Sequence, residues 1–354
     1  MLERWLARAK EGRLNYAAIA VCQYPDLVAN DFTGSVDMEL AMDFTLAKLR
    51  SNVQEAREKR LLPPRDPTLG ADYVCYNLNQ APLSFDLLPW LIDAEMTRVR
   101  LGAPAPLKVG FAREAEDEQT ESRNLMLDRL ARPMLKLLGA VEDERALLGR
   151  NKEVYVYGHV THAVKHLGEK APILQASDEA MYTVAHSLIG WSEPPPVVIT
   201  LREAQHWPHR NSNMKAWLKF ADRLKADGER VIIVRDTQEA EVLLEGYTTY
   251  PEASKDLDIR MALYEQAKIN LFVANGPWNL ALFGTRPWLM FNAVSSWDVF
   301  FPNTPLWWTK YQGISEGEQF PWSRTYQRII WKADDYDILC RAWDDFYNQK
   351  LEAA

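Results

Sequence analysis

The amino-acid sequence predicts an α/β fold with parallel sheets, built as two layered domains. Short apolar runs rich in β-branched residues alternate with segments of helical periodicity, which is the pattern of strand–helix–strand units. A length of 354 residues is more than one hydrophobic core usually serves. Residues 193–196 (Glu-Pro-Pro-Pro) interrupt the pattern near the middle, because proline can neither continue a helix nor donate to a strand ladder. We therefore expect domains at residues 1–193 and 197–333.

In the first half of the chain, a strand, a polar loop, a helix and a second strand follow one another between residues 73 and 111. Ser84 or Asp86 can cap the helix, which should end near Leu101. Such a unit implies a parallel sheet, because parallel strands need a long crossover connection. Strands are expected at residues 17–22, 73–76, 107–111 and 154–157, and helices at 2–10, 36–60, in the segment before Leu101, and at 122–138 and 181–189.

The second half repeats the alternation more clearly. Asn213 is expected to cap a helix and Gly228 to end it, since asparagine accepts from free N–H groups and glycine adopts left-handed backbone readily. Strands are expected at residues 197–201, 231–234, 270–274 and 288–291, and helices at 214–226, 258–267, 278–283 and 334–349.

Composition and charge narrow the possible functions. A net charge of −8 argues against general binding to nucleic acid or to an anionic membrane, although it leaves room for a local basic pocket. No stretch approaches the roughly 20 apolar residues of a membrane helix, and residues 1–13 are too charged for a secretory signal. Cys22, Cys75 and Cys340 lack metal or redox spacing. The prediction is a cytoplasmic protein without a nucleic-acid partner or transmembrane segment.

Histidines and tryptophans form two further groups of interest. His159, His162 and His166 are spaced like one face of a helix, but no carboxylate shares that spacing, so no metal site is predicted. The chain holds 13 tryptophans, five of them between Trp288 and Trp322. These rings can pack a core, or they can line a wall for a sugar or a lipid-linked acceptor.

Polar loops follow three predicted strands of the second half, and ligands bind outside the carboxyl ends of strands in open parallel sheets. Guanidinium groups and the free N–H groups of a helix start suit a diphosphate. The first loop offers both, or it is a surface loop with a capping asparagine. It leads into a helix start and carries Arg202, His206, His209, Arg210, Asn211 and Asn213.

The second loop begins at Asp236 and Thr237, where Asp236 can orient a hydroxyl of a ribose or sugar, or cap the next helix. The third loop is Asn275-Gly276-Pro277-Trp278-Asn279. Its glycine allows close backbone approach and its proline suits a first helical residue, so N–H groups would face a bound ligand. A plain strand-to-helix turn is the alternative. Together the three loops predict a site for a phosphorylated ligand.

Residues 267–287 (Ala-Lys-Ile-Asn-Leu-Phe-Val-Ala-Asn-Gly-Pro-Trp-Asn-Leu-Ala-Leu-Phe-Gly-Thr-Arg-Pro) resemble the donor-site segment of heptosyltransferase-like GT-B glycosyltransferases. Both have a hydrophobic strand that ends in Asn, a Gly-Pro turn, a short helix, and a Gly-Thr turn into the next strand. The unit from Arg210 to Asp236 also fits the family's strand–helix–strand arrangement. The family's Asp-Ser before Gly-Pro is absent here, and Asn279 stands where the family has His.

The resemblance implies a GT-B fold, which is two Rossmann-like domains facing across a cleft, with a last segment, residues 334–354, packed back across the junction. It implies that the second domain binds a nucleotide-sugar donor and the first an acceptor. Arg202 and Arg210 would face the diphosphate, as arginines do in GT-B fucosyltransferases. The expected activity is metal-independent transfer of a hexosyl, heptosyl or fucosyl group to a glycan, glycolipid or protein, as in polysaccharide biosynthesis, with no cofactor besides the donor.

Inverting transfer needs a base that takes the proton of the acceptor hydroxyl. Residues 75–91 resemble the family's first strand, polar loop and acceptor-side helix, where the loop carries an acidic catalytic residue. Asp86 is the nearest carboxylate, with helix capping as its alternative, and Glu203, Asp26 and Asp31 stay open as bases. Two other functions also stay open: pyruvyl transfer to a polysaccharide, and nucleotide or glycan binding without catalysis, which the missing Asp-Ser suggests.

Overall fold

The computed structural model describes residues 66–78, 83–112, 120–151, 173–189, 194–295, 303–324 and 326–352. The chain divides into two units, residues 1–63 and 64–354, and every described residue belongs to the second. Several predictions lie outside the described residues: the strands at 17–22 and 154–157, the helices at 2–10 and 36–60, and the side chains of Cys22, Asp26, Asp31, His159, His162 and His166.

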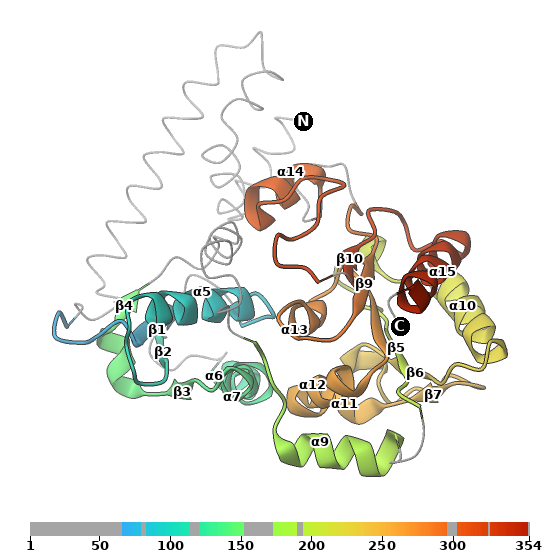
Figure 1. Ribbon diagram of the computed structural model, residues 1–354. Helices are drawn as coiled ribbons and strands as arrows, with labels where there is room; N and C mark the ends of the chain where they lie inside the picture. Colours follow the sequence, from blue (N-terminus) through green and yellow to red (C-terminus); the bar gives the residue numbers. More distant parts are fainter. Residues whose placement is uncertain are drawn as a thin grey trace, which may run out of the picture. The chain divides into compact units, whose positions relative to one another are not determined.

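Two parallel sheets organise the described residues (Figure 1), which confirms the predicted α/β fold. The first sheet has the strand order β3-β2-β1-β4, and every pair in it is parallel. Its strands are β1 (Tyr73–Asn77), β2 (Lys108–Ala112), β3 (Val141–Glu142) and β4 (Arg150–Asn151). Its helices are α5 (Leu87–Arg100), α6 (Thr120–Met126), η1 (Leu127–Ala131), α7 (Arg132–Leu138) and η2 (Glu144–Leu148). The edge strands β3 and β4 are too short to show a periodicity in the sequence.

The second sheet has the order β10-β9-β8-β5-β6-β7, again with every pair parallel. Along the chain, strands are added outward from β5 on one side and then outward from β8 on the other. This is the order of doubly wound Rossmann sheets, and the reversal between β5 and β8 is the topological switch point. The strands are β5 (Val197–Thr200), β6 (Val231–Val234), β7 (Thr248–Thr249), β8 (Ile269–Val273), β9 (Trp288–Phe291) and β10 (Gln327–Ile329).

Helices cover this sheet and explain its continuous apolar strands. Every residue of β5, β6, β8 and β9 is buried, as expected where both faces of a parallel sheet are covered. On one face α10 and α15 lie side by side, with Trp217, Phe220 and Trp343 in one core cluster (Figure 1). The helices are η5 (Pro208–Arg210), α10 (Met214–Ala226), η6 (Thr237–Glu239), α11 (Pro251–Lys255), α12 (Leu257–Gln266), α13 (Trp278–Leu282), α14 (Pro305–Trp307), η7 (Trp308–Gln312) and α15 (Tyr336–Glu352).

Local capping decides where several helices begin and end. Asn213 caps α10 as predicted, with its side chain accepting from the N–H of Ala216 at 3.3 Å. Gly228 follows the helix at φ 83°, as its stop signal predicted. The helix expected at residues 258–267 is α12, and a short helix, α11, directly precedes it. Asp256 separates the two, because it ends α11 and its side chain caps α12.

Residues 173–189 follow the first sheet and precede the second along the chain. They contain α9 (Asp178–Val184) and η4 (Ala185–Ile189). The first residues of this segment bond to the parts of the chain that build each sheet. Leu174 N–H donates to the carbonyl of Phe283, after α13, at 3.0 Å, and Gln175 N–H donates to the carbonyl of Leu137, in α7, at 3.1 Å. The division into domains at residues 193–197 stays a prediction. So does the packing of α15 across the junction, since its described contacts are with α10 and the second sheet.

Candidate functional site

The switch point of the second sheet brings two polar loops together. β5 and β8 are parallel neighbours, so the loops that follow them leave from the same edge of the sheet. These loops are residues 201–213 and residues 274–277. Arg210 crosses between them, donating from Nη2 to the carbonyl oxygen of Ala274 at 3.0 Å. Ligands of doubly wound sheets bind at this edge, beside the switch point.

Glu203 joins the first loop to the loop after β6. Its carboxylate pairs with the guanidinium of Arg235 through two hydrogen bonds, one of 2.9 Å from Nε to Oε2 and one from Nη2 to Oε1. The two side chains are 12% and 7% exposed, and the pair raises the pKa of Arg235. Glu203 N–H also donates to Oδ2 of Asp236 at 3.2 Å. The three predicted loops therefore meet at one edge of the sheet.

Arg202 organises its own loop. Its guanidinium donates to the carbonyl oxygens of His206 and Trp207, the latter at 3.0 Å, and to Oδ1 of Asn211. Burial lowers the pKa of Arg202, although the charge of Asp236 opposes that effect. These bonds make Arg202 a positioning residue for the loop. Direct contact with a diphosphate, which the resemblance implied for it, stays a prediction.

The loop bends at Trp207, whose backbone is left-handed, with φ 58° and ψ 60°. Such a conformation is a genuine outlier for a bulky residue and costs about 1–3 kcal/mol. The indole packs edge to face with the imidazoles of His206 and His209, with ring centroids 4.8 Å and 5.9 Å away. Both imidazoles are exposed. Partial burial and then the charges of Arg210 and Arg202 lower the pKa of His209, which favours its neutral form.

Asp236 caps the short helix η6, which confirms one of its two predicted roles. Its Oδ1 accepts from Thr237 N–H at 2.9 Å, while Oδ2 accepts from Glu203. A carboxylate offers about four acceptor sites, so a ligand hydroxyl can still be bound. The Thr237 hydroxyl donates to the carbonyl of Ser254 at 3.1 Å. Asp236 is half-buried and Thr237 is exposed.

The turn after β8 is shaped by Asn275 and by a close contact at Gly276. Asn275 is buried, and its Oδ1 accepts from Trp278 N–H at 3.1 Å. Asn279 donates from Nδ2 to the carbonyl of Gly276 at 3.1 Å. A Cβ added to Gly276 would lie 2.6 Å from the ring of Phe85, just before α5. The close approach at Gly276, which the sequence predicted for a ligand, is therefore made by the Phe85 side chain.

The start of α13 differs from the sequence-based expectation. The helix has five residues, and the Asn275 side chain takes its first N–H, so little of a helix dipole remains for a ligand. Pro277 stands at the N-cap position. Trp278 was expected to bind a ligand, but it is 3% exposed and packs against Trp288 and Trp308 at centroid distances of 5.5 Å and 6.0 Å. For these three tryptophans the core-packing interpretation is confirmed.

Asp86 stands at the start of α5 without capping it. Its side chain makes no capping hydrogen bond, and the Ser84 hydroxyl accepts from Asp86 N–H at 3.1 Å in its place. The carboxylate is half-buried and forms no ion pair with the described residues. Because Phe85 contacts Gly276, Asp86 is one residue away from the contact between α5 and the turn after β8.

Asp334 belongs to the edge of this site, although no pattern in the sequence marks it. Its side chain is buried, and Oδ2 accepts from Asn213 N–H and from the indole N–H of Trp217, each at 2.7 Å. A carboxylate of the chain thus occupies the start of α10, where a diphosphate was expected. Asp334 lies 121 positions from Asn213, so no local spacing could have revealed the contact.

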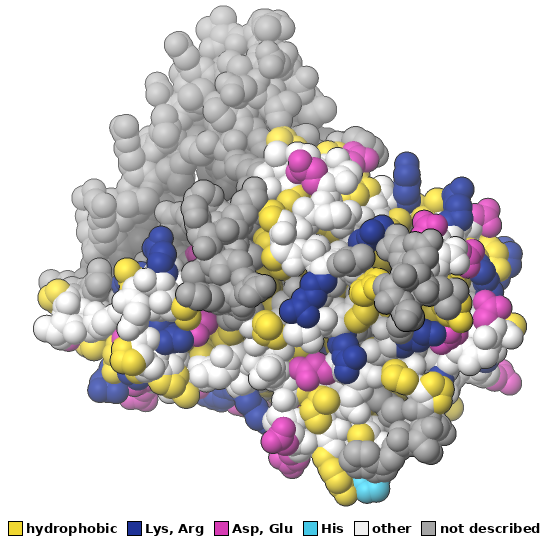
Figure 2. Space-filling model, viewed as in Figure 1, with side chains coloured by type: hydrophobic (Ala, Val, Ile, Leu, Met, Phe, Trp, Pro, Cys, Tyr) yellow, Lys and Arg dark blue, Asp and Glu magenta, His cyan; other side chains and the backbone are white. Residues whose placement is uncertain are grey.

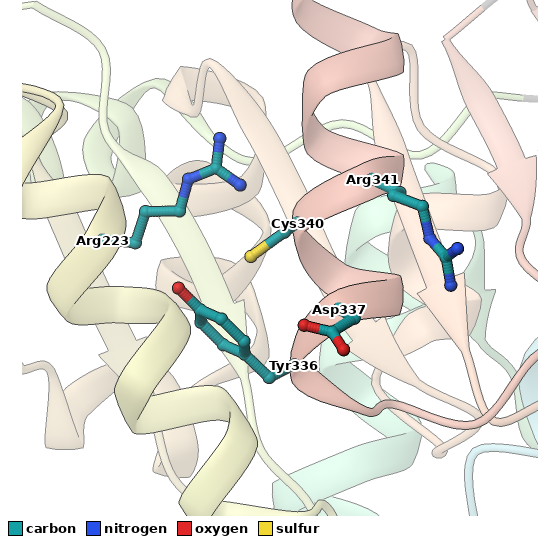
Figure 3. Close-up of a pocket in the computed structure, with 5 residues that line it drawn as sticks. All are labelled: Arg223, Tyr336, Asp337, Cys340 and Arg341. Atoms are coloured by element: carbon teal, nitrogen blue, oxygen red, sulfur yellow. The ribbon is translucent and has the colours of Figure 1, made fainter.

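A cavity of about 490 Å³ opens between α10 and α15 (Figure 3), and none of its lining residues belongs to the three loops. The close-up shows the Cys340 thiol between the guanidinium of Arg223 and the hydroxyl of Tyr336, while Arg341 points away. Arg223 pairs with Asp344. On the face in Figure 2, basic and acidic side chains are interspersed. Within the described ranges, no helix is long and apolar enough to cross a membrane.

No protein-family model matches the chain, and a search of curated proteins finds no match. Solved structures resemble it at low identity. Escherichia coli ADP-heptose lipopolysaccharide heptosyltransferase II is 12% identical, with 78% of this chain and 99% of that one covered and a TM-score of 0.47. A family 9 glycosyl transferase of Veillonella parvula is 9% identical, with 78% and 96% covered and a TM-score of 0.48.

Proposed function

We propose that the chain is a glycosyltransferase, which moves a sugar from a nucleotide-sugar donor to a glycan, glycolipid or protein acceptor. The observation that carries the proposal is the meeting of three polar loops at the switch point of a sheet wound in Rossmann order. Nucleotides bind at this point in doubly wound sheets. The resemblance of residues 267–287 to a donor-site segment favours a sugar nucleotide among the possible ligands.

Arg210 is the cation at the centre of the proposed donor site. Its hydrogen bond to Ala274 holds the guanidinium beside the turn after β8. An oriented arginine can stabilise the charge that develops on the departing diphosphate. Asp236 accepts from a ribose hydroxyl in this proposal, with Thr237 beside it. Because a guanidinium meets the charge of the leaving group, the transfer requires neither a metal ion nor a cofactor.

Asp86 is the base in this proposal. As the acceptor hydroxyl attacks the anomeric carbon, its proton passes to the Asp86 carboxylate and the bond from that carbon to the diphosphate breaks. The configuration at the anomeric carbon is inverted, and the nucleoside diphosphate leaves. Glu203 is less suited to this role, because Arg235 engages both of its oxygens.

Ligand-induced thermal shifts test the donor site. We expect one of GDP, UDP, ADP or CMP at millimolar concentration to raise the melting temperature of the full chain by a few degrees, since a ligand that binds the folded state stabilises it. Arg210→Ala should abolish that shift. Arg286→Ala is the matched control, because this exposed arginine precedes β9 at the opposite edge of the sheet. Absence of a shift with all four nucleotides contradicts the proposal.

Turnover with a nucleotide sugar tests the base. We expect Asp86→Asn to bind donor like the wild-type chain and to lose at least about a hundredfold in transfer rate, the usual contribution of a general base. Glu203→Gln should lower the free energy of unfolding while changing the transfer rate little, because it leaves Arg235 buried beside a neutral group. Unimpaired turnover of Asp86→Asn removes Asp86 from the mechanism.

Nucleotide binding without catalysis is the second candidate function. The engagement of Glu203 by Arg235 favours it, because one of the four carboxylates considered as the base is committed to an ion pair. The missing Asp-Ser before Gly276 points the same way. Donor binding without hydrolysis or transfer across a broad acceptor panel would select this function. Phosphoenolpyruvate in the donor panel covers the third possibility, pyruvyl transfer.

A further inference from the structure

We propose that the buried charge of Arg260, on α12, attracts an anionic ligand to the carboxyl edge of the second sheet and favours a diphosphate over less charged ligands. The inference rests on the proposed function, because the anion in question is the diphosphate of a nucleotide sugar. It adds a residue that acts through its electric field and needs no contact with the ligand. Three observations support it: the burial of Arg260, the lack of a carboxylate partner, and its position along α12.

Arg260 lies inside the fold, with only 3% of its surface exposed. Its Nε donates to the carbonyl oxygen of Ala253 in α11, and its guanidinium interacts with the hydroxyl of Tyr264, one helical turn further along α12. A guanidinium keeps its proton in proteins, so burial does not neutralise it as burial can neutralise a lysine. The interior of the fold therefore carries a full positive charge at this point.

The charge of Arg260 is not compensated by a partner. Among the described residues, no carboxylate forms an ion pair with it. Arg235, another buried arginine at this edge, shows the contrast, because Glu203 binds it through two hydrogen bonds. Burying a cation without a counter-ion is unfavourable for the folded state. Such departures from what folding favours are expected at functional sites.

Carboxylates at the start of α12 are engaged by other groups. Asp256 accepts from the first N–H groups of the helix, and Asp258 forms an ion pair with Lys136. Arg202 adds a second buried cation at this edge, held by carbonyl and amide oxygens, and only Asp236 opposes the effect of burial on its pKa. The described residues therefore leave buried positive charge in excess beside the three loops.

The direction of α12 places Arg260 near the candidate site. α12 leads directly into β8, so it runs opposite to the parallel strands and begins at their carboxyl edge. It covers the face of the sheet opposite to α10 and α15 (Figure 1). The hydroxyls of Tyr264 and Thr200, the last residue of β5, are hydrogen-bonded at 2.9 Å. Arg260 lies one turn closer to the start of α12, and so closer to the loop that follows Thr200.

α11, which accepts from Arg260, also bonds to the loop after β6. The Ser254 hydroxyl donates to the carbonyl of Arg235 at 2.8 Å, and the Ser254 carbonyl accepts from the Thr237 hydroxyl at 3.1 Å. Arg260 is thus joined through single residues to two of the three loops. Attraction between charges is stronger in protein surroundings than in water, so a diphosphate held by these loops is stabilised by Arg260 across the intervening groups.

The test uses two neutral replacements in the full chain. Arg260→Met removes the charge and the N–H donors, whereas Arg260→Gln removes the charge and keeps an N–H donor for the carbonyl of Ala253. Arg286→Gln is the matched control: Nε of Arg286 also donates to a backbone carbonyl, that of Glu265, but this arginine is exposed and precedes β9 at the opposite edge. Calorimetric titrations measure adenosine, AMP and ADP, the corresponding guanine and uracil series, and inorganic pyrophosphate.

We expect both neutral variants to bind the nucleoside diphosphate about tenfold more weakly than the wild-type chain, and the nucleoside equally well, because the attraction grows with the charge of the ligand. The loss for the monophosphate should lie between these two. Arg260→Gln without ligand should melt no lower than the wild-type chain, because it removes an uncompensated buried charge. The control should match the wild-type chain throughout.

Several results would overturn the proposal. Equal losses for nucleoside, monophosphate and diphosphate would show that Arg260 acts by shaping the site. A loss in Arg260→Met that is absent in Arg260→Gln would assign Arg260 to its bond with Ala253. Unchanged affinities in both variants would leave its charge without an effect. If no nucleoside or nucleotide binds the wild-type chain, the proposed function fails, and pyrophosphate alone then decides: weaker binding by both variants supports the role of the charge, and no binding by the wild-type chain overturns it.

Discussion

Polar residues at the edge of the second sheet mostly bond to the protein itself. Arg202 binds carbonyls of its own loop, Glu203 pairs with Arg235, and Asn275 accepts from the first N–H of α13. The physical reason is that a buried donor or acceptor without a partner costs free energy, so long loops satisfy their own polar groups first. The side chains proposed to act on a ligand, such as Asp86 and Asp236, are ones that keep some exposure.

Gly276 gives a test at the scale of one residue. We expect Gly276→Ala to destabilise the chain by about 1–3 kcal/mol in urea unfolding, because the new methyl group meets the ring of Phe85. Gly284→Ala is the control, since its Cβ would meet the flexible end of Met261 at 3.2 Å and two backbone oxygens at an ordinary contact distance of 3.4 Å. In a Phe85→Ala background the cost of Gly276→Ala should shrink. An unchanged cost in that background would contradict the assignment.

Helices α10 and α15 show how one element depends on another far along the chain. They pack side by side on the second sheet, and Asp334, just before α15, accepts from Asn213 and Trp217 at the start of α10. Asn213 caps the same helix with its own side chain. The start of α10, and with it the end of the loop that carries Arg202 and Arg210, is therefore positioned by the C-terminal segment.

Asp334→Ala tests this dependence. We expect a loss of about 2–3 kcal/mol in urea unfolding, because a buried indole N–H and a partly buried backbone N–H lose a charged acceptor. The thermal shift given by a nucleotide should weaken as well, because the loop before α10 loses its support. Asp222→Ala on the exposed side of α10 is the control and should cost less than about 0.5 kcal/mol. Equal stability of the two variants would argue against the role given to Asp334.

A polar contact joins a helix of the first sheet, α7, to a helix of the second, α12. Asp258 on α12 accepts from Lys136 on α7 at 2.5 Å, and from the hydroxyl and the N–H of Ser177 at 2.6 Å and 2.8 Å. Ser177 in turn caps α9. Burial raises the pKa of Asp258, but the bonds from Lys136 and Ser177 outweigh burial, so the pKa is lowered overall.

A pH-dependent stability measurement tests this contact. A carboxyl with a lowered folded pKa adds stability above its unfolded pKa of about 3.9, and this addition is lost as pH falls through the folded value. We expect Asp258→Asn to cost about 1–2 kcal/mol in urea unfolding at pH 7, and less at pH 3. The control Asp128→Asn alters an exposed pair with Arg132 and should cost little at either pH. A cost for Asp258→Asn that is undiminished at pH 3 would contradict the assignment.

Local sequence was sufficient for the kind and order of most described elements. Residues 197–201, 231–234, 270–274 and 288–291 read as strands because a sheet covered on both faces makes each strand a continuous apolar run. Asn213 and Gly228 marked the ends of α10 because capping depends on residues a few positions apart. The edge of the sheet at which a ligand would bind followed from the same alternation.

The partners of the polar residues required the folded chain. Phe85 against Gly276, Asp334 under Asn213, and Glu203 with Arg235 join residues that no periodicity connects. Strand order likewise depends on crossovers, which bring β8 beside β5 and so place the turn after β8 next to Arg210. The spacing of apolar residues within a segment indicates which face of that segment is buried. The contacts of a side chain depend instead on which segments the sheet brings together. For that reason the chain's pattern predicted the candidate site, and its geometry separates the residues that build that part of the fold from those exposed enough to meet a ligand.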